Sequence, residues 1–175
     1  MSRILWVAVV ATALALGPRS MHAQSNAVHF NLAAGATLPT GPFSDRTDVG
    51  YHLTGGLVVK QPGVALGFRA EGMYNGFNAK ATSGYSHTGV ITVNATYDLS
   101  TNSRSNTSSL YAIGGAGYYS TRESFETESE TDIGWNIGGG FEFPLTGFSA
   151  YVEARYHYVS NTDVRFVPIS FGVIF

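Results

Sequence analysis

The sequence predicts an all-β fold, an eight-stranded antiparallel up-and-down transmembrane β-barrel. Eight runs of the chain alternate between apolar and polar side chains with the period of two that is typical of strands. Charged residues make up 13% of the chain, whereas a soluble domain carries about 25%. The face opposite the apolar one is mostly small and uncharged, as the narrow interior of an eight-stranded barrel requires.

The composition excludes several other classes of protein. The chain has no cysteine, which excludes disulfides and thiolate metal sites. Its net charge of -2 lacks the basic excess of a nucleic-acid-binding protein. We therefore expect no nucleic-acid partner and no thiolate metal site, and no spacing of histidines or carboxylates indicates another metal or a cofactor.

The N-terminal segment has the pattern of an export signal. Arg3 is followed by an apolar run over residues 4–16, "ILWVAVVATALAL", and then by "GPRSMHA". The run has the length of a signal-peptide core and is too short to anchor the chain as a spanning helix. The sequence therefore predicts a signal peptide over residues 1–23, cleaved after Ala23, and a barrel domain over residues 24–175.

The predicted strands follow one another with no sustained helical pattern between them. Each has about the 9 to 11 residues that a tilted strand needs to cross a bilayer. They cover residues 27–38, 50–60, 64–74, 89–99, 109–119, 132–143, 148–159 and 165–175.

The connections between these strands alternate in length. Residues 61–63 ("QPG") and 144–147 ("PLTG") read as tight turns, whereas residues 75–88 and 120–131 read as long polar loops. Short turns on one side and long loops on the other are typical of outer-membrane barrels. Two connections fit this alternation less well, because residues 100–108 are long for a turn and residues 160–164 are short for a loop.

The run "AYVEARYHYV", residues 150–159, raises the question of which face of the barrel is outside. One parity of this strand is apolar, and the other carries Tyr151, Glu153, Arg155 and His157. In a membrane barrel the apolar face meets lipid and the charged face turns inward. The alternative is a secreted lipocalin-like carrier with the apolar face inside. The small side chains opposite the apolar face on the other strands favour the membrane barrel.

The last predicted strand, "FVPISFGVIF", adds the most specific signal. Phe171, Val173 and Phe175 share its lipid-facing parity, and an aromatic residue stands last. This pattern looks like the C-terminal signal recognised by the outer-membrane barrel assembly machinery. Together with the export signal, the eight strands and "EARYHYV", it resembles the small outer-membrane β-barrel family related to the OmpA and OmpX transmembrane domains.

The resemblance implies a location, partners and a class of role. The protein is expected in the bacterial outer membrane as a monomer, surrounded by lipid and lipopolysaccharide after insertion by the assembly machinery. A structural or surface-interaction role is expected, without enzymatic activity.

Four charges are predicted to meet inside the barrel. Strands three and seven lie opposite each other in a closed ring of eight, and their inward parities carry Arg69 and Glu71, and Glu153 and Arg155. Two positive and two negative charges at mid-strand predict a neutral network that plugs the lumen. A gate that opens by exchanging ion-pair partners is the alternative.

Two other functions remain open at this point. A narrow pore would conduct poorly past the central charges. A lipid A-modifying enzyme would need a His-x-Ser-Asn motif, whereas "HYVSN", residues 157–161, separates His157 from Ser160 by two residues and places them on opposite faces of a continuous strand.

Overall fold

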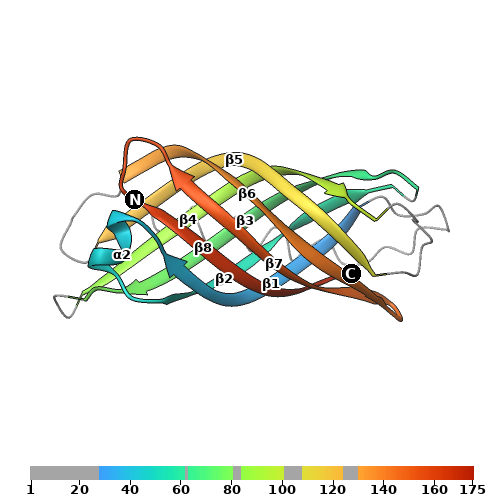
Figure 1. The fold of residues 1–175 in the computed structure, drawn as a ribbon, viewed down its shortest axis with the longest axis horizontal. Coiled ribbons are helices and arrows are strands. Elements are labelled where there is room, and N and C mark those ends of the chain that lie inside the picture. Colours follow the sequence, from blue (N-terminus) through green and yellow to red (C-terminus); the bar gives the residue numbers. More distant parts are fainter. Residues whose placement is uncertain (1–27, 62, 81–83, 101–107, 124–129) are drawn as a thin grey trace, which may run out of the picture.

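A computed structural model describes residues 28–61, 63–80, 84–100, 108–123 and 130–175. It confirms the predicted fold class, because eight antiparallel strands close into a barrel in the order β1 to β8 (Figure 1). The strands are β1 (Val28–Pro39), β2 (Gly50–Lys60), β3 (Leu66–Asn78), β4 (Tyr85–Asp98), β5 (Ser109–Glu123), β6 (Glu130–Leu145), β7 (Phe148–Val159) and β8 (Arg165–Ile174). The predicted signal segment, residues 1–23, lies outside the described residues.

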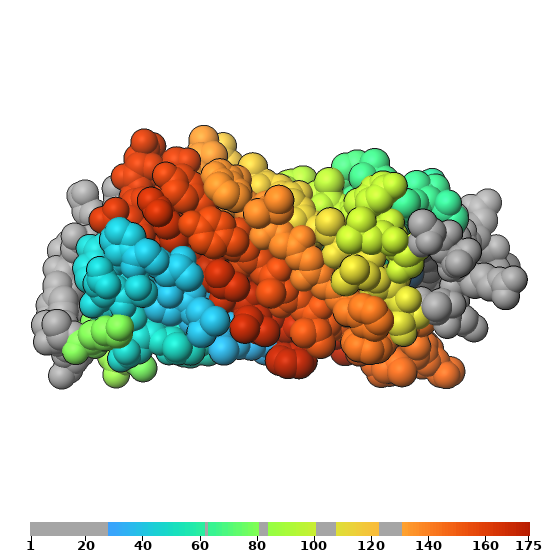
Figure 2. All heavy atoms as spheres, in the orientation of Figure 1, coloured from blue at the N-terminus to red at the C-terminus, as the bar shows by residue number. Residues whose placement is uncertain are grey.

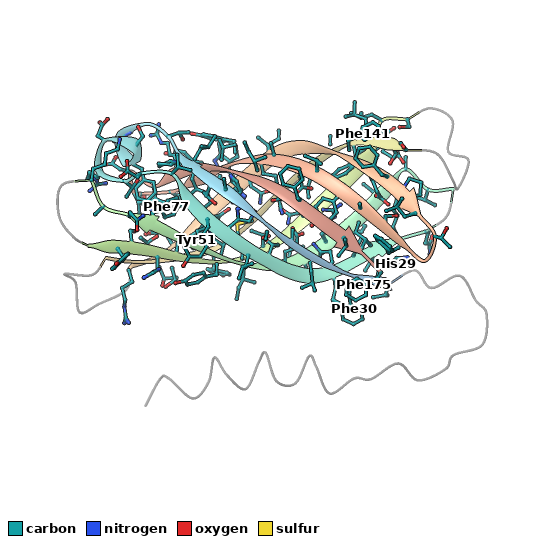
Figure 3. The ribbon with its side chains drawn as sticks, turned by 90° about the horizontal axis from the view of Figure 1, so that it is seen from below. His29, Phe30, Tyr51, Phe77, Phe141 and Phe175 are labelled. Atoms are coloured by element: carbon teal, nitrogen blue, oxygen red, sulfur yellow. The ribbon has the colours of Figure 1, made fainter. Side chains whose placement is uncertain are left out.

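The barrel closes by pairing its first strand with its last. β1 and β8 are antiparallel, with Ala34 opposite Phe171. Beyond this register, Phe30 and Phe175 exchange backbone hydrogen bonds of 2.8 and 2.9 Å, and their rings stack with centroids 6.3 Å apart. Figure 3 shows these two rings side by side, far from the short helix α2 (Pro42–Arg46). The paired ends leave no free edge at the seam between β1 and β8.

Outward and inward side chains divide as the period of two predicts. The outward face carries an apolar band that includes Leu53, Val93, Ile137 and Phe171, all exposed. Figure 2 shows this outer wall as a continuous surface on the side that faces the viewer. A carrier barrel with its apolar face inside is the reverse of this arrangement. No helix in the described part of the chain is long and apolar enough to span a membrane.

The two ends of the barrel differ. The β1–β2 and β7–β8 connections lie at the end that holds α2, called here the α2 end, together with the last paired residues of β3 and β4 and of β5 and β6. The C-terminus lies at the opposite end (Figure 1). At that opposite end the β6–β7 turn is tight and places Gly147 at φ 89°, a conformation that glycine adopts without strain. The turn after β2 likewise places Gly63 at φ 79°.

Four strands extend further toward the α2 end than the sequence predicted. β3 and β4 continue through the predicted loop 75–88 until Asn78 pairs with Tyr85. β5 and β6 continue into the predicted loop 120–131, where Ser120 pairs with Thr131. The polar composition of these segments suggested loops, but hairpin pairing satisfies their backbone groups equally well in water. Most of the acidic stretch at 122–132 lies outside the described residues.

The helix α2 was not predicted, because five residues are too few for a helical period. Its Phe43 is buried, and Thr47, just after the helix, forms a β-bridge with Ala79. The Lys80 ammonium donates to the Ser44 carbonyl at 2.7 Å. The β1–β2 connection is thus tied to the β3–β4 hairpin across the α2 end of the barrel.

Candidate functional site in the barrel lumen

Strands β3 and β7 bring the four predicted lumen charges together. Arg69 Nη1 donates to Glu153 Oε2 at 3.0 Å, across the barrel. In the other direction, Arg155 Nη1 donates to Glu71 Oε2 at 2.7 Å. The central charge network is defined here as these four residues, and each is at most 3% exposed.

Pairs along each strand complete the central charge network. Arg155 Nε lies 2.7 Å from Glu153 Oε1, without the geometry of a hydrogen bond. Arg69 Nη1 lies 3.9 Å from Glu71 Oε1. Every charge therefore has an opposite charge both on its own strand and on the opposite strand, and the four charges sum to zero. Buried charges need such pairing, because their desolvation costs several kcal/mol for each ion.

Neutral donors surround the two carboxylates. Asn31 Nδ2 donates to Glu71 Oε1 at 2.7 Å, and Asn94 Nδ2 donates to Glu71 Oε2 at 3.3 Å. The hydroxyl of Tyr111 donates to Glu153 Oε2 at 2.7 Å. Hydrogen bonds to charged groups are the stronger ones, so these donors fix the carboxylates in place.

Two tyrosine rings hold the Arg69 guanidinium between them. Its Cζ atom lies 4.9 Å from the Tyr111 ring centroid and 5.1 Å from the Tyr151 ring centroid. Each ring lies across a glycine of the next strand: a Cβ on Gly140 would collide with Tyr111, and one on Gly172 would collide with Tyr151. The glycines therefore make room for the aromatic rings beside the charges.

The two lumen histidines lie between the central charge network and the α2 end. His52 Nδ1 is 3.0 Å from Thr37 Oγ1, and its Nε2 is 2.9 Å from Ser170 Oγ. His157 Nδ1 is 3.0 Å from the Tyr119 hydroxyl. Across the described residues, no group of three histidine or carboxylate side chains is arranged to hold a metal ion.

The "HYVSN" motif does not show a paired histidine and serine in this structure. His157 is buried in the lumen and stacks on Phe166, with ring centroids 4.9 Å apart. Ser160 lies beyond the end of β7, and its backbone N–H donates to the Ile133 carbonyl at 2.9 Å. Within the described part of the chain, no hydrogen bond joins His157 to Ser160.

An apolar cluster fills the lumen at the α2 end, and the sequence did not predict it. The ring of Phe43, from α2, packs edge-on against the ring of Phe77, with centroids 5.1 Å apart. The centroids of the Phe77 and Phe166 rings are 6.0 Å apart. Figure 3 labels Phe77 at this end. The outer apolar cluster consists of Phe43, Met73, Phe77, Val90, Tyr119, Val159, Val164 and Phe166.

Lys60 and Glu142 form an ion pair near the opposite end of the lumen. Lys60 Nζ donates to Glu142 Oε2 at 3.3 Å, between β2 and β6. Unlike the central charge network, the Lys60 side chain is about one-third exposed. The Lys60–Glu142 pair is therefore a partly solvated ion pair with which the buried ion pairs can be compared.

The residues of the predicted C-terminal signal lie on the outside of β8. Phe171 is 64% exposed and Phe175 is 54% exposed, with Val173 between them partly covered. Their side chains thus face away from the lumen and toward the surroundings of the barrel.

Sequence reasoning missed several partners of the central charge network. Asn31 and Asn94 have the inward parity, which marks them as lumen residues without revealing which charge they contact. Tyr111 lies on a strand that is apolar on both faces, so parity gave no signal for its bond to Glu153. The pairing of Tyr111 with Gly140 on the neighbouring strand would have indicated where this ring has room to lie.

Comparisons with known proteins agree with the barrel fold. The sequence matches the family described as "Outer membrane protein beta-barrel domain" over residues 8–175. A search of curated proteins found no match.

Several solved structures share the fold. The chain is similar to Neisserial surface protein A, with a TM-score of 0.68 at 18% identity, over 85% of this chain and 96% of that one. The chain is also similar to the attachment invasion locus protein Ail of Yersinia pestis, with a TM-score of 0.55 at 15% sequence identity. The match covers 84% of this chain and 95% of that one. The N-terminal β-barrel domain of Pseudomonas aeruginosa OprF is similar with a TM-score of 0.54 at 15% sequence identity. That match covers 87% of this chain and 100% of the other. At these identities the likeness is one of fold.

Proposed function

The chain belongs to the outer membrane protein β-barrel domain family, and on that premise we propose that it works through its cell-surface end and not by passing solutes through its lumen. It is an integral protein of the bacterial outer membrane. In this proposal the barrel is a monomer held in lipid and lipopolysaccharide. Its α2 end lies outside the cell, because the hairpins extend further at that end and the tight β6–β7 turn and the C-terminus lie at the opposite one. No enzymatic step is part of the proposed role.

The observation that carries this proposal is a set of buried side-chain contacts at two levels of the barrel interior. The central charge network spans the barrel from β3 to β7 through bonds of 3.0 and 2.7 Å. Nearer the α2 end, the outer apolar cluster packs Phe43, Phe77 and Phe166 against one another inside the barrel. An ion on this path would have to separate buried ion pairs and then cross an apolar layer, and both steps cost several kcal/mol.

The names of two structural neighbours support a surface role. One is called a surface protein, and the other an attachment invasion locus protein. Ail has also been solved in complex with the heparin analogue sucrose octasulfate. The present chain has the same kind of frame, in which a rigid barrel carries connections that are free to vary.

Conductance distinguishes a closed barrel from a pore. The refolded protein, inserted into a planar lipid bilayer, is expected to show no stable conductance steps in 1 M KCl, because both layers of the lumen stay in place. A general porin in the same bilayer is the positive control, and heat-modifiable migration on an SDS gel verifies that the sample is folded. Reproducible ohmic steps from the folded protein would favour the narrow pore instead.

We also propose that Phe171, Val173 and Phe175 act as the signal for outer-membrane assembly. Phe171 and Phe175 are exposed on the outside of the barrel, and Val173 lies partly covered between them, so an assembly factor can reach this surface before lipid covers it. Phe175→Ala is expected to lower the amount of heat-modifiable barrel in the outer-membrane fraction of expressing cells. In vitro, the same variant should still refold into detergent micelles.

Phe148→Ala is the matched control for Phe175→Ala. Phe148 is also an exposed aromatic residue at the end opposite α2, 43% exposed on β7, but it is not part of the proposed signal. It should lose a similar lipid contact and assemble normally in cells. Equal yields of the two variants in the outer membrane would contradict the signal role.

A further inference from the structure

A polar cavity of about 540 Å³ opens at the α2 end of the barrel. We propose that this cavity, called here the vestibule, binds a short neutral saccharide at the cell surface. The inference rests on the proposed surface role and deepens it by naming a class of ligand. The volume falls within the range of about 300–1,000 Å³ that small-molecule sites occupy.

The walls of the vestibule come from four parts of the chain. β5 contributes Thr121, β6 contributes Asp132, and Arg46 lies at the end of α2. The β7–β8 connection closes the remaining side with Thr162 and Asp163. In Figure 2 the segment around α2 lies next to this connection, at the α2 end. Residues far apart in the sequence thus meet around one space.

The lining is rich in polar groups and carries no net charge. Arg46 and Arg165 are balanced by Asp132 and Asp163. The contact between Arg46 and Asp163 is loose, at 3.8 Å, with both side chains more than half exposed. Exposed pairs of this kind hold their geometry weakly, so both groups can turn to a ligand. A balanced lining favours a neutral ligand over an anion or a cation.

The arrangement matches the chemistry of a sugar ring. Carboxylates accept hydrogen bonds from hydroxyl groups, whereas guanidinium and threonine groups donate to the ring and hydroxyl oxygens. Arg165 contributes a second guanidinium to the lining, and its Cζ atom lies 5.0 Å from the centroid of the Tyr158 ring, which stacks on Trp135. Val159 and Val164 add apolar side chains beside these polar groups, and this combination suits a molecule with C–H faces and hydroxyl edges.

The floor of the vestibule makes it a binding site and not an entrance. Tyr119, Val159 and Val164 line the vestibule and also belong to the outer apolar cluster. A ligand in the vestibule therefore rests on the layer that closes the lumen. The saccharide is expected to be held at the surface without being transported.

Amide NMR titration of the isotopically labelled barrel in dodecylphosphocholine micelles tests the inference. A maltoside detergent is avoided because its head group is itself a sugar. The probes are maltotriose, cellotriose and triacetylchitotriose, with sucrose octasulfate as the anionic comparison. At least one neutral trisaccharide is expected to give saturable shifts at the amides of Thr121, Asp132 and Thr162.

Two carboxylate variants separate the vestibule from the rest of the α2 end. Asp132→Asn is expected to weaken the binding of that trisaccharide by about tenfold, because a charged acceptor is lost. Asp48→Asn removes an exposed carboxylate on the same side of the barrel that does not line the vestibule. It should leave the affinity unchanged.

Three results would overturn the saccharide site. These are no saturable shifts with any neutral trisaccharide at tens of millimolar, binding of sucrose octasulfate alone, or equal weakening by Asp132→Asn and Asp48→Asn. Conductance of the same preparation is measured alongside. A closed barrel without saccharide binding would refute only this site, whereas a conducting barrel would refute the proposed function.

Discussion

Replacing Arg155 with methionine is expected to lower the free energy of unfolding in phospholipid vesicles by about 3 to 5 kcal/mol. The change leaves the Glu71 carboxylate without its partner at 2.7 Å and removes the contact with Glu153. Both carboxylates are almost fully buried, so water cannot replace the lost guanidinium. Urea titration followed by tryptophan fluorescence and heat-modifiable migration measures the loss.

Two further variants show whether the loss comes from burial of the charges. Lys60→Gln breaks the Lys60–Glu142 ion pair, which is partly solvated, and is expected to cost only about 0 to 1 kcal/mol. Adding Glu71→Gln to Arg155→Met removes one uncompensated carboxylate and should recover part of the lost stability. If the double variant were less stable than Arg155→Met alone, the central charge network would not act as a set of compensating pairs.

Replacing Ile137 with arginine is expected to destabilise the barrel in vesicles by about 2 to 4 kcal/mol. Ile137 lies midway along the outward row of β6 and is 60% exposed. In water, a substitution at an exposed position usually changes stability by no more than about 0.5 kcal/mol. A large loss therefore reports that hydrocarbon surrounds this side chain. Urea titration after refolding into phosphatidylcholine vesicles measures it.

Thr131→Arg on the same strand is the matched control for Ile137→Arg. Thr131 also points outward, but it lies beyond the apolar band, near the α2 end. Arginine at such an interfacial position is expected to cost about 0 to 1 kcal/mol. Equal losses at the two positions would contradict a bilayer boundary between them.

Parity along the strands predicted the orientation of the barrel wall. In β7 the alternation of "AYVEARYHYV" assigned Glu153, Arg155 and His157 to one face, and the structure buries all three. A strand has only two faces, so one assignment decides the direction of every side chain along it. Closure of eight strands in sequence order then makes β3 the strand opposite β7. This is why reasoning about parity alone placed Arg69 and Glu71 across from Glu153 and Arg155.

The alternation of side chains along each strand could not predict which residues meet across the lumen. The bond from Tyr111 to Glu153 depends on the tilt of β5, and on Gly140 leaving space beside the ring. The α2 segment offered no periodic signal, because its burial rests on Phe43 alone. Strand ends were also misjudged at the α2 end, where paired hairpins and loops have the same polar composition.

The number of strands, their inward and outward faces and the balance of charge inside could be predicted from the sequence, because they follow from period-two alternation and the closure of the ring. The contacts inside the barrel could be learned only from the folded structure. The partners of each carboxylate, the outer apolar cluster beneath α2 and the vestibule above it depend on distances between strands that are far apart in sequence. Those distances follow from the tilt and register of the closed barrel, which local patterns do not encode.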